Sequence, residues 1–277
     1  AGLVPPLRDA DVAVVNVEMA IAEGGTAQAG KEFTFRAPPS AATTLAAAGI
    51  DVGALGNNHA ADFGIDALVE TVRHLRGAGV RPVGAGRNAD EAFAPAVVEV
   101  ARPGSAPVSV AFVSASGVVP AGFAAADSTP GIASAYEQQR LLDAVTAAAE
   151  AHDVVVALLH WGVERAPCPT VSQVALGDAL VGAGAHVVVG SHPHVLQPVV
   201  ERGGGVIAYS LGNFAWHSRS GPQGETGVLE VRFVGDRVDG FSFHPHMLDA
   251  SGAPVPANAA AAARIESAVE RACPVVV

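Results

Sequence analysis

Short runs of valine and isoleucine, bounded by turn residues, recur along the chain and predict β-strands. The predicted strands cover residues 12–17, 52–55, 108–113, 154–159, 187–189 and 206–209. Most of these runs are apolar at every position rather than at alternate positions, which is typical of strands covered on both faces. We therefore expect sheets that are buried between other layers.

Helical periodicity separates the strand-like runs. Apolar residues recur at helical spacing over 65–75, before the Gly77-Ala78-Gly79 stop, and similar patterns cover 141–151 and 171–180. The alanine-rich stretch 257–272 predicts a last helix. Strands that alternate with helices predict an α/β protein with helices packed on sheets.

The pattern changes toward the C-terminus. Residues 228–233 and 238–243 contain alternating positions and flank Gly235-Asp236, which is typical of an antiparallel hairpin and suggests a mixed second sheet. The sequence shows no internal repeat and no long linker, so we expect residues 1–277 to form a single domain.

Composition limits the classes of protein that fit. Half of the 277 residues are hydrophobic, enough for a large core, but every apolar run is shorter than the roughly 20 residues of a membrane helix. The first residues lack the basic and apolar regions of a signal peptide. A signal peptide that has already been removed is the alternative. The two cysteines, Cys168 and Cys273, show no metal-binding spacing, and a disulfide and two free thiols are both compatible with the sequence.

The net charge of −11 opposes attraction to phosphate backbones, so we expect no nucleic-acid partner. An anionic substrate would need a local source of positive charge, and a bound metal ion is the strongest such source in a small site.

Four short segments at the ends of predicted strands carry side chains that bind divalent metals or move protons. They are Asn16-Val17-Glu18, Gly56-Asn57-Asn58-His59, His160-Trp161-Gly162 and Gly190-Ser191-His192-Pro193-His194. Side chains at strand ends can converge although they lie far apart in sequence. The sequence therefore predicts a metal-centred active site.

The histidines are the clearest ligands. His192 and His194, two residues apart directly after a valine run, can point at adjacent positions of one metal centre. His160 ends a buried run at the carboxyl edge of the sheet, where a hydrogen-bonded core histidine is the alternative. His244-Pro245-His246 has the same spacing as the first pair but ends the hairpin, and we interpret it as surface histidine.

The strand-to-helix turn adds an oxygen ligand and a proton donor. Asn58 can offer its amide oxygen, and His59 can stay off the metal to stabilise a developing charge or protonate a leaving group. Alternatively, both asparagines serve turn geometry. Asp62 either orients His59 or caps the next helix, and we favour the cap. Glu18 either bridges two cations or is an exposed loop acid.

These motifs resemble the bacterial poly-gamma-glutamate capsule synthesis family of the CapA type, a branch of the calcineurin-like metallophosphoesterase superfamily. The similarity runs over about residues 9–233. It rests on six motifs, namely Asn16-Val17-Glu18, Phe35-Arg36-Ala37-Pro38, the stretch 56–64, the stretch 160–164, the stretch 190–195 and the stretch 209–214. The resemblance implies a four-layer αββα sandwich of two mixed sheets placed face to face, with helices outside.

The resemblance also implies roles. Glu18 corresponds to the bridging carboxylate, Asn58, His160 and His192 complete one metal position, and His194 belongs to the other. His59 corresponds to the catalytic histidine beside the metal. Arg36, Asn57 and Trp161 are the candidates for substrate contact, although packing is the alternative for Arg36 and a core position the alternative for Trp161. The implied cofactor is one or two divalent ions of Mn, Fe, Zn or Mg.

One departure from the family pattern matters. The family opens with a strand ending in Gly-Asp, whose aspartate is a metal ligand, and neither Asp9 nor Asp11 follows a strand. We therefore expect this first strand to be absent from the chain as given and to come from an upstream segment or another chain, or the second metal position to be incomplete. The remaining ligands favour one cation.

The resulting hypothesis is a metal-dependent enzyme that acts on a phosphate or acyl-phosphate centre, as a phosphoesterase-like hydrolase or an amide-forming enzyme, in capsule or poly-gamma-glutamate assembly. The alternatives are a noncatalytic scaffold or anion-binding subunit of a synthesis complex, and a hydrolase of amides or esters. Expected partners are a small anionic or polymer substrate and proteins of a synthesis complex. The resemblance suggests that the protein is located in the cell envelope, and the cytoplasm is the alternative.

Overall fold

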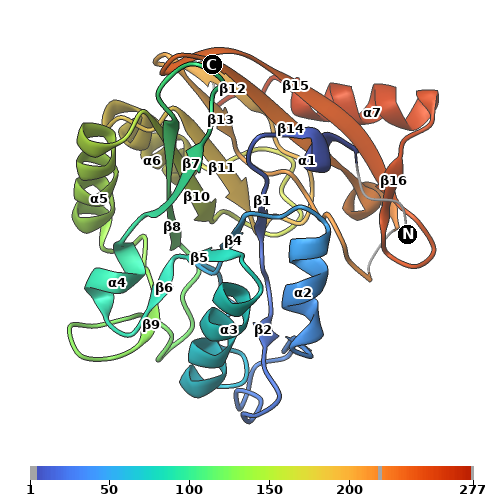
Figure 1. The fold of residues 1–277 in the computed structure, drawn as a ribbon. Coiled ribbons are helices and arrows are strands. Elements are labelled where there is room, and N and C mark those ends of the chain that lie inside the picture. The colour runs from blue at the N-terminus through green and yellow to red at the C-terminus, as the bar shows by residue number, and fades with distance from the viewer. Residues whose placement is uncertain (1–4, 218–219, 276–277) are drawn as a thin grey trace.

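A six-stranded mixed sheet carries most of the long buried strands in the computed structural model, which describes residues 5–217 and 220–275 (Figure 1). Its strand order is β12-β13-β11-β10-β8-β7. The strands are β7 (Ala96–Val100), β8 (Val108–Ser116), β10 (Val154–His160), β11 (Val187–Ser191), β12 (Val199–Arg202) and β13 (Gly205–Ala208). The four central strands are parallel, and the two edge strands are antiparallel to their neighbours.

Two three-stranded sheets complete the framework. The first is parallel, in the order β1-β4-β5, and the second is antiparallel, in the order β14-β15-β16. Their strands are β1 (Val14–Asn16), β4 (Val52–Ala54), β5 (Arg81–Val83), β14 (Glu225–Val234), β15 (Arg237–Leu248) and β16 (Pro254–Pro256). The predicted C-terminal hairpin is confirmed by β14 and β15. Two short pairs join β2 (Ala20–Ile21) to β3 (Arg36–Ala37) and β6 (Ala85–Gly86) to β9 (Gly131–Ile132).

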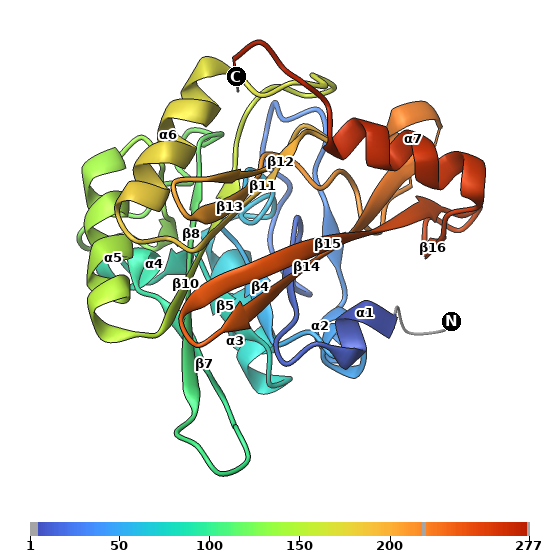
Figure 2. The ribbon, with the colours of Figure 1, turned by 90° about the horizontal axis from the view of Figure 1, so that it is seen from above.

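Helices cover the outer faces of the sheets. They are α1 (Pro5–Asp9), α2 (Ser40–Ala47), α3 (Ile65–Gly77), α4 (Ala89–Phe93), α5 (Gln138–Ala151), α6 (Val171–Gly182) and α7 (Ala259–Val269), with a 3-10 turn η1 (Gly221–Gly224). Figures 1 and 2 place α5 and α6 beside the six-stranded sheet, and Figure 2 places α7 along the β14-β15-β16 sheet. Apolar residues of α3 and α2 pack in one cluster with Val15 of β1 and with Leu55, which follows β4.

The faces of β10 show how these layers form. Val155, Ala157 and Leu159 pack in one cluster with α5 and α6. Val154, Val156 and Leu158 pack instead with residues of β4 and β5, on the facing sheet. The continuous apolar run is therefore buried on both sides. The expected α/β layers are confirmed, with a mixed six-stranded sheet, while the sheet that contains the hairpin is antiparallel.

A cavity of about 1490 Å³ lies between β1 and β14 and reaches the ends of β10 and β11. Within the described residues, β1 pairs only with β4, and β14 pairs only with β15. On the side of the cavity, neither β1 nor β14 has a strand partner among the described residues.

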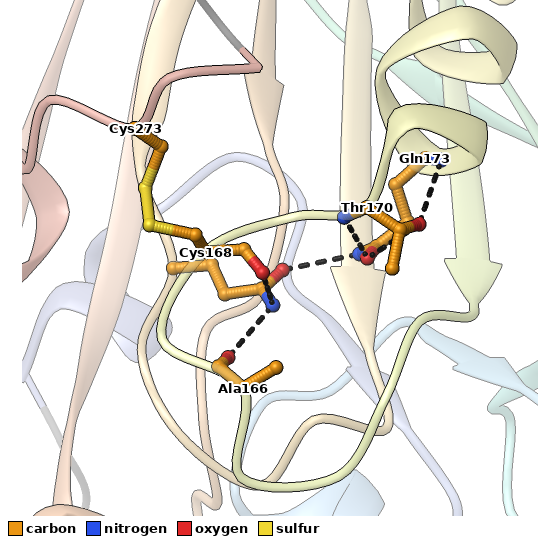
Figure 3. Close-up of a disulfide and its surroundings, with 6 residues drawn as sticks. Ala166, Cys168, Thr170, Gln173 and Cys273 are labelled. Carbon is orange, nitrogen blue, oxygen red and sulfur yellow. Dashed lines mark hydrogen bonds between the residues drawn. A yellow bond between two sulfur atoms is a disulfide. The ribbon is translucent and has the colours of Figure 1, made fainter.

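A disulfide joins Cys168, in the loop after β10, to Cys273, after α7 (Figure 3). The two cysteines therefore form a disulfide and are not free thiols, the two possibilities that the sequence left open. Behind it, the Gln197 side chain donates to the carbonyls of Ala166 (2.9 Å) and Cys168 (3.1 Å) and accepts from Gln173 at 3.1 Å. The loop is therefore fixed both covalently and by a buried amide network.

Two further predictions concern the histidines of the hairpin and the membrane. The interpretation of His246 as a surface histidine is wrong, because the side chain is buried and its Nδ1 lies 2.8 Å from the carbonyl oxygen of His244 on β15. His244 itself lies 2.8 Å from the Glu230 carboxylate on β14. Among the helices that the structure describes, none has the length and apolar character needed to cross a membrane.

Candidate functional site

The carboxyl ends of four parallel strands from two facing sheets meet at one place. Glu18 follows β1, Asn58 follows β4, His160 ends β10 and His192 follows β11. His160 pairs in register with Ser191, so the β10 and β11 loops leave the sheet side by side. Because parallel strands end at a common edge, the loops of both sheets converge there.

Four buried side-chain atoms in this cluster have no hydrogen-bond partner among the described residues: Glu18 Oε1, Asn58 Oδ1, His160 Nε2 and His192 Nδ1. Buried polar groups are normally paired, and each one left unpaired costs about 1–3 kcal/mol. All four are lone-pair donors of the types that bind divalent metals. This donor set fits a divalent cation.

The opposite sides of these groups are held in place. Asn16 Nδ2 donates to Glu18 Oε2 at 2.9 Å, which leaves Oε1 free. The Ser191 hydroxyl donates to the carbonyl oxygen of Leu159 at 3.3 Å and lies 3.0 Å from His160 Nδ1. Ser191 therefore accepts the hydrogen bond from Nδ1, so that His160 Nε2 carries the lone pair.

His194 is oriented in the same way. Asn213 Nδ2 donates to the carbonyls of His194 and Gln223, so its Oδ1 must accept the hydrogen bond from His194 Nδ1, 2.7 Å away. His194 Nε2 then carries a lone pair, 3.9 Å from Glu18 Oε1, and His160 Nε2 lies 3.6 Å from the same oxygen. One oxygen of the Glu18 carboxylate thus lies within 4 Å of a ring nitrogen of each histidine.

Burial controls the charges in the cluster. It raises the pKa of Glu18 to about 8, although the positive charge of Lys31 acts in the opposite direction. Burial, reinforced by neighbouring histidines, lowers the pKa of His160 well below its usual range, and burial lowers the pKa of His192 to about 4. The histidines therefore keep their lone pairs at neutral pH, and a bound cation would stabilise the Glu18 carboxylate.

The loop after β11 has an unusual backbone. His192 and His194 have positive φ angles of 96° and 56°, which non-glycine residues adopt at a cost of about 1–3 kcal/mol each. Gly190 allows the β10 loop to approach, because a Cβ atom there would lie 2.0 Å from the Tyr209 carbonyl oxygen and 2.3 Å from Trp161 Nε1. Gly190 thus has a steric reason, whereas the two histidines are kept despite a backbone cost.

His59 belongs to a separate network. Its Nδ1 lies 2.7 Å from Asp62 Oδ2, and Asp62, with no exposed side-chain surface, also accepts from the Phe35 amide and contacts Lys31 Nζ. The cap interpretation of Asp62 is wrong, because α3 begins only at Ile65. Asp62 orients His59 instead.

Lys31 is a residue that the sequence analysis missed. Its Nζ contacts the Asp62 carboxylate and the Asn58 carbonyl oxygen and lies 3.1 Å from His59 Nδ1. It lies in a loop without periodicity, but it is the only lysine of the chain, a signal that could have drawn attention to it.

Substitution of Lys31 by methionine should lower the free energy of unfolding by about 3 kcal/mol, because it leaves the buried Asp62 carboxylate without its cation. Urea denaturation measures the effect. Arg73→Met is the matched control, since this exposed residue pairs with Glu70 at the surface and should contribute less than about 1 kcal/mol. Equal losses in the two variants would contradict a role for Lys31 in holding Asp62.

Two aromatic side chains, also missed, connect His59 to His194. The Phe35 ring lies 4.5 Å from the His59 ring and 4.9 Å from Trp216, whose ring stacks on His194 at 5.4 Å between centroids. Trp216 also lines the cavity. Trp216 thus lies between the cavity and Phe35, which contacts His59.

The candidates for substrate contact lie elsewhere. Asn57 is fully buried and uses its amide on Asn16, Val17 and His59, and Trp161 is 3% exposed and donates to the Tyr209 carbonyl at 2.9 Å. The substrate-binding interpretation does not hold for either, because neither has a free polar group. The exposed Arg36 stacks on Phe63 at 4.4 Å and donates to loop carbonyls, in agreement with the packing alternative.

Comparison with known proteins identifies relatives. The model of the bacterial capsule synthesis protein family, PGA_cap, matches residues 1–218. The PGA biosynthesis protein CapA of Bacillus subtilis (strain 168) is 32% identical over 213 residues, which cover 76% of this chain and 55% of the relative. A protein of Mycobacterium tuberculosis (strain CDC 1551 / Oshkosh) named "Probable polyglutamine synthesis accessory protein" is 32% identical, over 73% of this chain and 55% of the relative.

Among solved structures, a hypothetical protein from Thermus thermophilus has a similar fold. The TM-score is 0.51 and the sequence identity 20%, over 87% of this chain and 90% of that one. The chain spans about half the length of the two curated relatives. The extent of the family match, together with the identity to CapA, shows that the chain belongs to the bacterial capsule synthesis protein family.

Proposed function

We propose that the chain is a metal-dependent enzyme that acts at a phosphate or acyl-phosphate centre in the assembly of a capsule polymer of the poly-gamma-glutamate type. The observation that carries this proposal is the set of four unpartnered ligand atoms on Glu18, Asn58, His160 and His192. The name of the Bacillus subtilis relative, a PGA biosynthesis protein, supports the link to this polymer.

Glu18, Asn58, His160 and His192 would hold the cation. A divalent cation supplies Lewis acidity and positive charge to a phosphoryl group. His194, oriented by Asn213, places a further ring nitrogen 3.9 Å from Glu18 Oε1. The net charge of −11 makes this local positive potential necessary for an anionic substrate.

His59 would handle the proton of the leaving group. Asp62 fixes the His59 ring through Nδ1, and Lys31 fixes Asp62, so the ring cannot rotate freely. A positioned histidine of this kind contributes about 10²–10⁴-fold to rate by acid–base catalysis. Phe35 packs on the same ring and limits the access of water to it.

The test is turnover of p-nitrophenyl phosphate, a phosphodiester and acetyl phosphate with Mn²⁺. His59→Gln should lower kcat by about 10²–10⁴-fold and leave cation affinity, measured by calorimetry, unchanged. His152→Gln, at the end of α5, is the control and should match the wild type. A wild type that binds the cation but turns over none of these substrates would contradict the enzymatic proposal.

A noncatalytic role is the second candidate, favoured by the accessory role in the name of the Mycobacterium tuberculosis relative. In that case the same site would bind an anionic polymer or stabilise a subunit of a synthesis complex with partner proteins. A chain that binds polyglutamate with the same affinity in the presence of Mn²⁺ and of a chelator, without turnover, would favour this role.

A further inference from the structure

Glu164 lies in the loop after β10, beside the two histidines that follow β11. One carboxylate oxygen of Glu164 and one ring nitrogen each of His192 and His194 lie within 4.8 Å of one another. Ligand atoms about 2.0–2.2 Å from a common cation lie roughly 3–4 Å apart. Because Glu164 is exposed, rotation of its side chain can close the remaining distance.

We propose that Glu164 provides a carboxylate ligand for a second divalent cation, held together with His194 and bridged to the first position by Glu18. This inference rests on the proposed function, because it assigns the second cation of the same site. It goes beyond the ligands expected from the sequence, which did not include Glu164.

The neighbouring ligands divide between two positions. His192 is nine-tenths buried, and its Nδ1 is among the unpartnered atoms of the first position. The Nε2 of His194, whose Nδ1 is bound to Asn213, lies 3.9 Å from the unpartnered Glu18 Oε1. A cation beside His194 thus has a nitrogen and a bridging oxygen available, and Glu164 supplies the next oxygen.

The loop holds Glu164 in this place. The Trp161 amide donates to the Ser191 carbonyl at 3.0 Å, and the Arg165 amide donates to the Pro193 carbonyl at 2.7 Å. Glu164 is therefore tied, through the next residue, to the peptide between His192 and His194.

Metal stoichiometry tests the proposal without an activity assay. Metal-free chain is dialysed against Mn²⁺, bound metal is counted by mass spectrometry, and the electron paramagnetic resonance spectrum reports whether two Mn²⁺ ions are coupled. The wild type should bind two ions with a coupled spectrum. Glu164→Gln should bind one ion with the spectrum of isolated Mn²⁺, with at least a tenfold loss of affinity at the second position.

Glu99→Gln is the matched control, because Glu99 is an exposed glutamate on the edge strand β7, far along the sheet from the site. It should keep two ions. Two coupled ions in Glu164→Gln, or a single ion in the wild type, would overturn the assignment of Glu164 while the first position stands. A wild type that binds no ion would overturn the proposed function as well.

Discussion

Replacement of His160 by alanine should abolish the stabilisation that a divalent cation gives to the wild-type chain. A cation at 1,000 times its Kd raises the free energy of unfolding by about 4 kcal/mol when it binds only the folded state. His160 Nε2 is one of the four unpartnered atoms, and its loss leaves an incomplete site. Urea denaturation with Mn²⁺ and with a chelator measures the difference.

Leu159→Ala controls for the loss of packing. Leu159 is as buried as His160 but points into the cluster with α5 and α6. It should lose about 2–5 kcal/mol of stability under both conditions and keep the full response to Mn²⁺. A His160→Ala chain that keeps this response would contradict the assignment of the first position.

Removal of the disulfide should have an effect of similar size. Cys168 and Cys273 are 105 residues apart, and a crosslink that closes about 100 residues stabilises the folded state by about 4.7 kcal/mol in the chain-entropy description. The double variant Cys168→Ser/Cys273→Ser should therefore lose about 4–5 kcal/mol in urea denaturation.

Reduction provides the control for this prediction. Dithiothreitol should lower the stability of the wild type to that of the double variant and leave the double variant unchanged. A difference below about 1 kcal/mol between the oxidised wild type and the double variant would show that the crosslink does not limit the unfolded chain.

The strands of the main sheet were predictable because runs of valine strongly favour buried β-strands. The run 154–159 is apolar at every position and forms the fully buried β10. α2 was missed because its threonines and alanines give only weak apolar periodicity. β2 and β3 were missed because pairs of two residues have no pattern of their own.

The convergence of Glu18, Asn58, His160 and His192 followed from their places at strand ends. Lys31 and Glu164 could not be found in this way, because loops hold them: Lys31 by its contact with Asp62, Glu164 by the bond from the Arg165 amide. Asn57 and Trp161, the candidates for substrate contact, are both buried in the structure. Their burial depends on tertiary packing that neighbours in sequence do not report.

The left-handed backbone at His192 and His194 has an evolutionary consequence. Glycine at either position would relax the main chain, so selection for foldability alone favours its appearance by mutation. Imidazoles at such angles carry a backbone cost that glycine would not carry. In variants of this chain that no longer need the site, His192 and His194 should be replaced earlier than the other residues of the site.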